Sequence, residues 1–172
     1  MIQLIDIGDI SPKEIQHLAN NYRIKKNLRD LFPFPYSIED ATTFLELVSN
    51  GVMGHVFAIV YNNDFIGIGS LIPQNYEHRG NAEIGYWIGE PYWGRGYATA
   101  AVKLLIQFAF ENLDITRAYA YVYSFNSASM RVLEKSGFQK EAVLLLSVIK
   151  EGKLYDEHLY SISNNRIRAS AT

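Results

Sequence analysis

Hydrophobic and polar residues alternate at the start of the chain, over Ile2–Ile7, and this period of two predicts a β-strand. A helix is expected to begin at Ser11-Pro12-Lys13-Glu14. A serine cap, a proline in the first helical position and a glutamate three residues after the cap are typical of helix starts. Two prolines interrupt the helical pattern within residues 28–36. A second helix is predicted over Ser37–Ser49, and Gly51 ends it.

The middle of the chain combines strand patterns with one long helical pattern. Val56–Tyr61 and Phe65–Leu71 flank Asn62-Asn63-Asp64 and predict a hairpin with a three-residue turn. Ala82–Ile88 is predicted to be another strand. Over Tyr97–Asn112, apolar residues recur every three to five positions, which places them in one stripe along a helix.

Aromatic residues occupy every second position of the next predicted strand, Arg117–Tyr123. Tyr119, Tyr121 and Tyr123 therefore share one face of it. We expect this face to pack under a helix, with the lining of an acceptor pocket as the alternative. A short helix, Ser127–Ser136, is closed by the glycine that follows it.

The chain ends in a predicted hairpin, in which Lys150-Glu151-Gly152-Lys153 joins Gln139–Ile149 to Leu154–Ile162. The whole order is strand, two helices, three strands, helix, strand, helix and two strands. Early antiparallel hairpins with one strand–helix–strand crossover predict a mixed sheet, so the fold class is α/β or α+β. No linker or repeat divides the chain, and we expect a single domain over residues 1–172.

Composition narrows the class of protein. The chain has 172 residues and a net charge of −2, so a nucleic-acid or membrane partner is not expected. Cysteine is absent, which excludes disulfides, thiolate metal sites and a cysteine nucleophile. No apolar run approaches the length of a membrane helix, and no secretion signal is expected at the first residues. The four histidines show no ligand spacing, so no metal is expected. A soluble, cytoplasmic protein is predicted.

The most informative segment is a glycine-rich turn between a strand and a helix. Pro91 ends the strand region, and Gly94 and Gly96 flank Arg95 just before the helix. Glycines allow unusual backbone angles and close ligand approach, and a helix start offers unpaired N–H groups to an anion. A connection without a ligand is the alternative. A dinucleotide-binding fingerprint is not favoured, because Thr99 stands where its third glycine would be.

Four segments together resemble the GNAT superfamily of N-acetyltransferases. Asn126–Phe138 is similar to its "Asn-x-x-Ser…Leu-Glu-Lys-x-Gly-Phe" signature, and Trp93–Ala98 resembles its pyrophosphate loop. Glu83–Gly89 and Leu31–Ala41 are similar to the branch of ribosomal-protein N-terminal acetyltransferases and polyamine acetyltransferases. The resemblance covers essentially the whole chain. It implies the GNAT fold, a mixed, mostly antiparallel twisted sheet with helices on both faces.

The resemblance implies acetyl-CoA as the co-substrate. Backbone N–H groups near Arg95, Gly96 and Ala98 would bind the pyrophosphate, and Trp93 stands where the superfamily often has glutamine or arginine. Main-chain groups of Tyr86 and Ile88 would pair with the pantetheine arm. The full set of expected cofactor-binding residues is Tyr86, Ile88, Trp93, Gly94, Arg95, Gly96, Tyr97, Ala98, Thr99, Asn126 and Ser129.

Roles in catalysis also follow from the resemblance. Leu133 occupies the position where many members have a general-acid tyrosine, so Ser129 is expected to donate to the departing sulfur. A local helix-start role is the alternative for Ser129, as a plain N-cap is for Asn126. Glu83 is the expected general base. It lies five residues before Ile88, so a bulge near Gly85 is needed to bring both to one face. A solvated strand residue without a catalytic role is the alternative for Glu83.

In the ribosomal branch a glutamate after the Gly-Phe corner can serve as the base, and Val148 occupies that position here. Phe34, Tyr36 and Glu83 are the expected acceptor contacts, with Glu90 and Glu39 as secondary candidates.

The predicted activity is acetyl transfer from acetyl-CoA to a primary amine, either a protein N-terminus or a small molecule, by direct attack. A non-catalytic acyl-CoA-binding regulatory module is the alternative. A monomer or a homodimer is expected.

Overall fold

The computed structural model describes residues 1–164. Its strands are β1 (Ile2–Asp6), β2 (His55–Tyr61), β3 (Asp64–Pro73), β4 (Asn81–Ile88), β5 (Arg117–Tyr123), β6 (Gln139–Lys150) and β7 (Lys153–Ser163). Its α-helices are α1 (Pro12–Ala19), α2 (Tyr22–Lys25), α3 (Ile38–Ser49), α4 (Tyr97–Asn112) and α5 (Ser127–Lys135). Short 3₁₀ turns lie at Ile7–Asp9, Tyr76–His78 and Glu90–Tyr92.

The strands of this part of the chain form one sheet in the order β1-β2-β3-β4-β5-β7-β6. β4 and β5 are parallel, whereas β1 with β2, β5 with β7 and β6 with β7 are antiparallel. The predicted mixed α/β class is therefore confirmed. By their internal contacts the residues divide into two compact units. The first comprises Met1–Ser70 and Tyr86–Ala101, and the second comprises Leu71–Gly85 and, of the described residues, 102–164.

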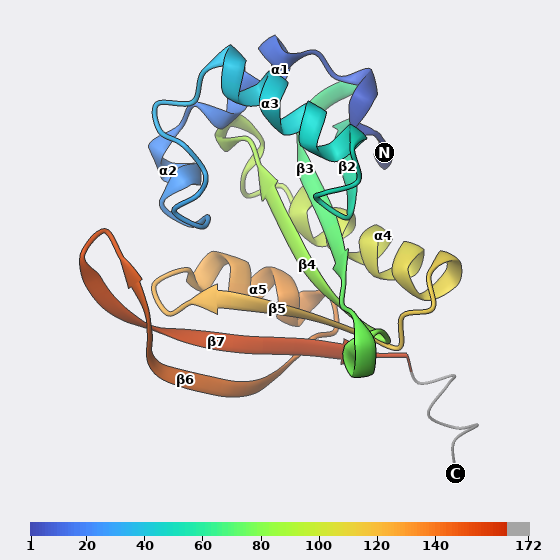
Figure 1. Cartoon of the computed structure of the whole chain (residues 1–172), viewed down its shortest axis with the longest axis vertical. Helices are drawn as coiled ribbons and strands as arrows, with labels where there is room; N and C mark the ends of the chain where they lie inside the picture. The colour runs from blue at the N-terminus through green and yellow to red at the C-terminus, as the bar shows by residue number, and fades with distance from the viewer. Residues whose placement is uncertain (165–172) are drawn as a thin grey trace. The chain divides into compact units, whose positions relative to one another are not determined.

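The core of the first unit lies between α1, α3 and the strands β2 and β3 (Figure 1). Both helices begin with a capping box, Ser11 with Glu14 and Ser37 with Asp40. The cap at Ser11 was predicted, whereas Ser37 was expected as the first residue of its helix. Fully buried side chains such as Ile15 hold the helices against the sheet, and the burial of such apolar groups is the main stabilising contribution. The remaining buried members of this core include Leu18, Ala19, Ala41, Ala58, Val60, Phe65 and Ile68.

In the second unit α5 packs on one face of β5 and β7. The Tyr160 hydroxyl of β7 donates a hydrogen bond of 2.9 Å to Glu134 Oε1 of α5, and Leu133 of α5 has no exposed surface. Tyr160 lies opposite Ala120 in the ladder. Residues paired across a ladder share a face of the sheet, so the α5 face of β5 is its alanine and valine face.

The tyrosines of β5 lie on the other face, and the prediction that they pack under a helix was wrong for α5. Tyr121 is 43% exposed, whereas Ala118, Ala120 and Val122 are buried. The small residues allow α5 to approach the sheet closely, which three large phenol rings would prevent.

Both predicted hairpins are present, but their turns are tighter than expected. The turn between β2 and β3 has two residues, Asn62 and Asn63, with φ of 51° and 72°. The turn between β6 and β7 has Glu151 and Gly152, with φ of 51° and 77°. Two consecutive positive φ values are those of a type I′ turn, whose twist matches that of the flanking strands. The predictions of a three-residue and a four-residue turn were therefore wrong in length, because each turn has two residues.

The short helix α2 was not predicted. It has four residues and is capped by Asn21, whose side chain accepts a hydrogen bond from the Arg23 backbone N–H. One helical turn is too short to show a period of 3.6 residues. Longer elements agree closely with the prediction, and α4 and β5 have the predicted bounds.

We expect stability to fall at alkaline pH through two buried tyrosines. Burial, with Asp40 nearby, raises the pKa of Tyr36 from 10.0 to about 12. Burial and the bond to Glu134 raise the pKa of Tyr160 from 10.0 to about 12. The unfolded chain loses these protons first, so stability is complete below about pH 10 and declines as the pH rises towards about 12. Urea unfolding across this window measures the decline, which Tyr160→Phe should reduce; an identical decline in that variant would contradict the assignment.

Candidate functional site

The glycine-rich turn of the first unit forms an open start to α4. Gly94 and Gly96 have φ of 75° and 78°, in the left-handed region that glycine adopts at little cost. A Cβ built on either glycine would meet no atom within 4 Å. The backbone angle, and not a lack of space, therefore requires glycine here, and the exposed backbone leaves room for a ligand.

Aromatic packing against β2 holds the first turn of α4. The Tyr97 ring stacks on Tyr61 of β2, with ring centroids 4.6 Å apart. Ala98 packs beside Tyr97 against buried Ile59 and Ile66. The Ala100 N–H donates to the Gly96 carbonyl over 3.1 Å, so the N–H groups of the three residues between them precede the regular helical ladder. Such groups attract anions at a helix start.

Trp93 takes a structural position that the sequence motif did not indicate. Its indole Nε1–H donates a hydrogen bond of 2.6 Å to the carbonyl oxygen of Ile88. This is one of the main-chain groups expected to pair with a pantetheine arm. A carbonyl oxygen has two lone pairs, so the indole bond occupies one acceptor site of Ile88 and leaves the other. Tyr86 lies two residues earlier in β4.

The expected acceptor contacts in the first unit differ in exposure. Phe34 is 46% exposed and meets Tyr22 edge to face, at 5.5 Å between ring centroids. Tyr36 is buried in the core and stacks on Phe32 at 4.8 Å. Of these two rings, Phe34 is therefore the one that presents surface to a ligand. Glu39 is exposed on the first turn of α3.

Asn126 and Ser129 come together at the start of α5 in the second unit. Asn126 is the N-cap, and its Oδ1 accepts a hydrogen bond of 3.1 Å from the Ser129 backbone N–H. The local capping role considered for Asn126 is therefore present. Capping uses only the Oδ1 atom, so the Nδ2 amide keeps its capacity to donate. Ser129 is half-buried in the first turn, and Leu133 one turn later belongs to the core.

Glu83 lies on the tyrosine face of the second unit. It pairs with Tyr119 across the parallel β4–β5 ladder and is half-buried, between the buried residues Ala82 and Ile84. The bulge expected near Gly85 stays a prediction. The structure thus holds Glu83, Asn126 and Ser129 in the second unit, whereas Tyr86, Ile88 and Trp93–Thr99 belong to the first.

Glu141, a carboxylate after the Gly-Phe corner, is held by hydrogen bonds within the protein. Glu141 accepts a hydrogen bond of 2.6 Å from Arg117 and a further bond from the Ser161 hydroxyl. Both bonds, that of Arg117 first, lower the pKa of Glu141. An anchored carboxylate with a lowered pKa is a poor general base, so Glu141 is not favoured over Glu83 for the base expected from the sequence.

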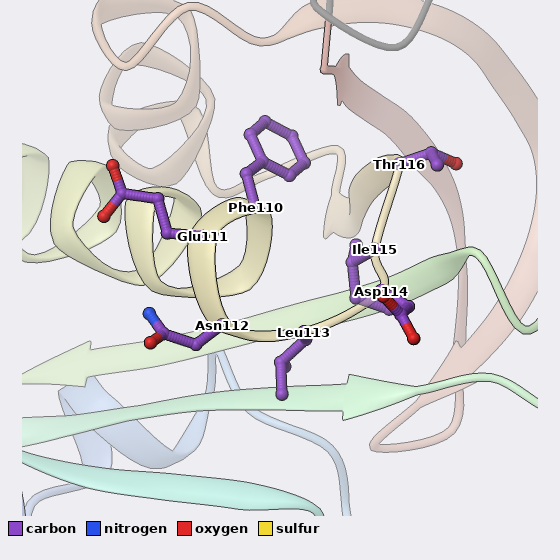
Figure 2. A pocket seen from close by; sticks show the side chains of 7 residues that line it. All are labelled: Phe110, Glu111, Asn112, Leu113, Asp114, Ile115 and Thr116. Carbon is purple, nitrogen blue, oxygen red and sulfur yellow. The ribbon is translucent and has the colours of Figure 1, made fainter.

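A cavity of about 390 Å³ lies at the C-terminal end of α4 and is lined by Phe110, Glu111, Asn112, Leu113, Asp114, Ile115 and Thr116. Figure 2 shows these side chains around the link from α4 to β5. None of the expected site residues lines it. Within residues 1–164, no group of three or more histidines or carboxylates could hold a metal ion. No helix in the same part of the chain is long and apolar enough to cross a membrane.

Comparison with known proteins points to one family. A family model described as an acetyltransferase (GNAT) domain matches residues 7–139. The Bacillus subtilis protein YdaF, provisionally named a ribosomal N-acetyltransferase, is 34% identical over 173 residues, which cover 92% of this chain and 90% of YdaF.

Two further matches agree with this family. YoaA of Bacillus subtilis, named an uncharacterized N-acetyltransferase, is 40% identical over 90 residues. That match covers 52% of this chain, and the chain spans about half the length of YoaA, 50%. The solved structure of the microcin C7 self-immunity acetyltransferase MccE with acetyl-CoA and AMP has a TM-score of 0.81 at 26% identity, covering 95% of this chain and 92% of MccE.

Proposed function

The chain belongs to the GNAT acetyltransferase family, and we propose that it transfers an acetyl group from acetyl-CoA to a primary amine. The observation that carries the proposal is the open turn of Gly94, Arg95 and Gly96 at the start of α4. Its two positive φ angles and empty surroundings suit a backbone that must approach a phosphate.

The residues of the first unit fit the charged part of acetyl-CoA. The N–H groups of Tyr97, Ala98 and Thr99 and the positive end of the α4 dipole would hold the pyrophosphate. Arg95 is exposed beside them and adds a positive charge. Tyr86 and the remaining acceptor site of Ile88 would pair with the pantetheine arm as a neighbouring strand does. Acetyl-CoA supplies the thioester carbon that the amine attacks.

Glu83 and Ser129 of the second unit are proposed as the general base and as the hydrogen-bond donor to the leaving thiolate. Glu83 would accept a proton from the amine, directly or through a water molecule. Ser129 would donate a hydrogen bond to the sulfur as the thiolate leaves, and Asn126 Nδ2 would hold the pantetheine arm. We propose that the amine attacks the thioester directly, and the chain has no cysteine that could carry the acyl group as a thioester.

The proposed acceptor is a protein N-terminus or a small-molecule amine, with Phe34 as the exposed aromatic contact. The provisional name of YdaF supports the first of these. An enzyme that uses acetyl-CoA requires a compartment that contains it, so the proposed location is the cytoplasm.

Acetyl-CoA cleavage should depend on an added amine. We expect free thiol to appear faster when the protein is mixed with acetyl-CoA and members of an amine panel that includes polyamines, amino acids and N-terminal peptides. A thiol reagent follows the release. Binding of acetyl-CoA without faster release for any amine would instead favour a non-catalytic acyl-CoA-binding module.

Gly96→Glu should abolish tight binding of CoA. The new carboxylate would face the phosphates, and repulsion between charges at close range corresponds to about 100-fold weaker binding or more. Calorimetric titration with CoA measures the affinity. Gly152→Glu is the matched control, because Gly152 also has a positive φ of 77° and open surroundings but lies in the β6–β7 turn. Equal affinity in the two variants would reject the phosphate site.

Glu83→Gln and Ser129→Ala should each lower kcat by about 100-fold, because each removes a group that assists the transition state. Binding of CoA should change little in Glu83→Gln. Steady-state rates at saturating acetyl-CoA give the result. Ser127→Ala serves as the control, since Ser127 also lies in the first turn of α5, where its hydroxyl accepts from Arg131. An unchanged kcat in both Glu83→Gln and Ser129→Ala would reject the catalytic roles proposed for these two residues.

A further inference from the structure

Glu90 has both carboxylate oxygens occupied by groups from one distant segment. Asn21 Nδ2 donates to Glu90 Oε2 over 2.6 Å, across 69 positions of sequence. Arg23 Nη1 forms an ion pair with Glu90 Oε1. Asn21 is also the N-cap of α2, so a single residue both begins that helix and holds the carboxylate.

The same arginine reaches the residue next to the glycine turn. The Arg23 guanidinium lies over the Trp93 ring, 5.1 Å from its centroid. The edge of that ring is fixed in turn by the bond from Nε1 to the Ile88 carbonyl. Arg23 therefore contacts both ends of the short segment Glu90–Trp93, and the name "Glu90 clamp" is used below for Asn21, Arg23, Glu90 and Trp93.

Gly89, the residue before Glu90, is also held in place by its neighbours. The Gly89 N–H donates to the Ile66 carbonyl over 2.8 Å. A Cβ at Gly89 would lie 3.0 Å from Leu18 of α1, so the backbone is packed closely against that helix. The chain is thus held at Gly89, Glu90 and Trp93, and the open glycines follow immediately.

The exposure of the ion pair indicates what it does. The Arg23 side chain is 62% exposed and that of Glu90 is 33% exposed. Exposed ion pairs contribute little to folding stability. Their directional bonds can still fix the direction of a segment, and fixing a loop in its bound conformation strengthens binding by lowering the cost of ordering it.

We infer that Glu90 is a positioning residue, which through the Glu90 clamp sets the direction of the Gly94–Gly96 turn for the CoA pyrophosphate. The inference rests on the proposed function, since it assigns a purpose to that same turn. It also replaces the role of acceptor contact considered for Glu90. Tyr22, next to Arg23, contacts Phe34, so the clamp joins the proposed acceptor side of the first unit to its cofactor turn.

Glu90→Gln tests the clamp with almost no change in shape. Both Glu90 oxygens accept hydrogen bonds, and glutamine would replace one acceptor with a donor that faces another donor. We expect the Kd for CoA and the KM for acetyl-CoA to rise about tenfold, with kcat at saturation within about threefold of the wild type. Arg23→Met should have a similar effect. The double variant should weaken binding by less than the product of the two single effects, because the Arg23–Glu90 contact is already lost in each single variant.

Asp30→Asn is the matched control. It removes the ion pair between Lys25 and Asp30, 3.7 Å apart and also on α2 and its following segment, and should leave the Kd for CoA within about twofold. If Glu90→Gln does not fold, Arg23→Met supplies the measurement, because the Arg23 side chain is 62% exposed, and the same loss of affinity for CoA is expected.

The outcomes separate the clamp from the proposed function. Wild-type protein that binds CoA, with clamp variants that bind equally well, would overturn the clamp alone. Wild-type protein that does not bind CoA would overturn the proposed function and the clamp with it. A weaker affinity explained by a matching loss of folded protein in urea unfolding would assign a structural role to Glu90 and also reject positioning.

Discussion

The start of α4 carries N–H groups that the helix itself cannot satisfy, and much of the first unit is arranged around them. A helix leaves its first N–H groups without intrahelical partners. Here Gly94 and Gly96, with positive φ angles, precede these groups, and neither glycine has a side chain. Tyr97 stacks on Tyr61 beneath the same turn. The result is a helix start that is packed at Tyr97 and exposed at the two glycines.

This arrangement explains how a nearly neutral chain is suited to a highly charged co-substrate. The net charge is −2, and no broad basic surface is needed when backbone dipoles provide the attraction. The absence of cysteine has a chemical counterpart in the proposed mechanism. In the proposed reaction the only thiol belongs to the co-substrate, and the amine would attack the thioester directly.

The long elements were predictable because their signals are local. The apolar stripe of Tyr97–Asn112 and the alternation of Arg117–Tyr123 span enough residues to show their period. The turn at Asn62 and Asn63 was predicted too long, because the strand twist, rather than composition alone, selects the type I′ form. The single helical turn of α2 has no period to detect. The alternation in β5 did not show which face of the strand α5 covers, because that depends on how closely the helix can approach the sheet.

Sequence by itself determined the glycine turn, the capping residue Asn126 and the family, because each depends on residue types at short, fixed spacing. Tertiary structure decided that Tyr36 is buried, that the Trp93 indole holds Ile88, and that Glu90 is held from α2. The physical reason is distance along the chain. A contact across 69 positions exists only after the core has brought two segments together, and no local pattern encodes it.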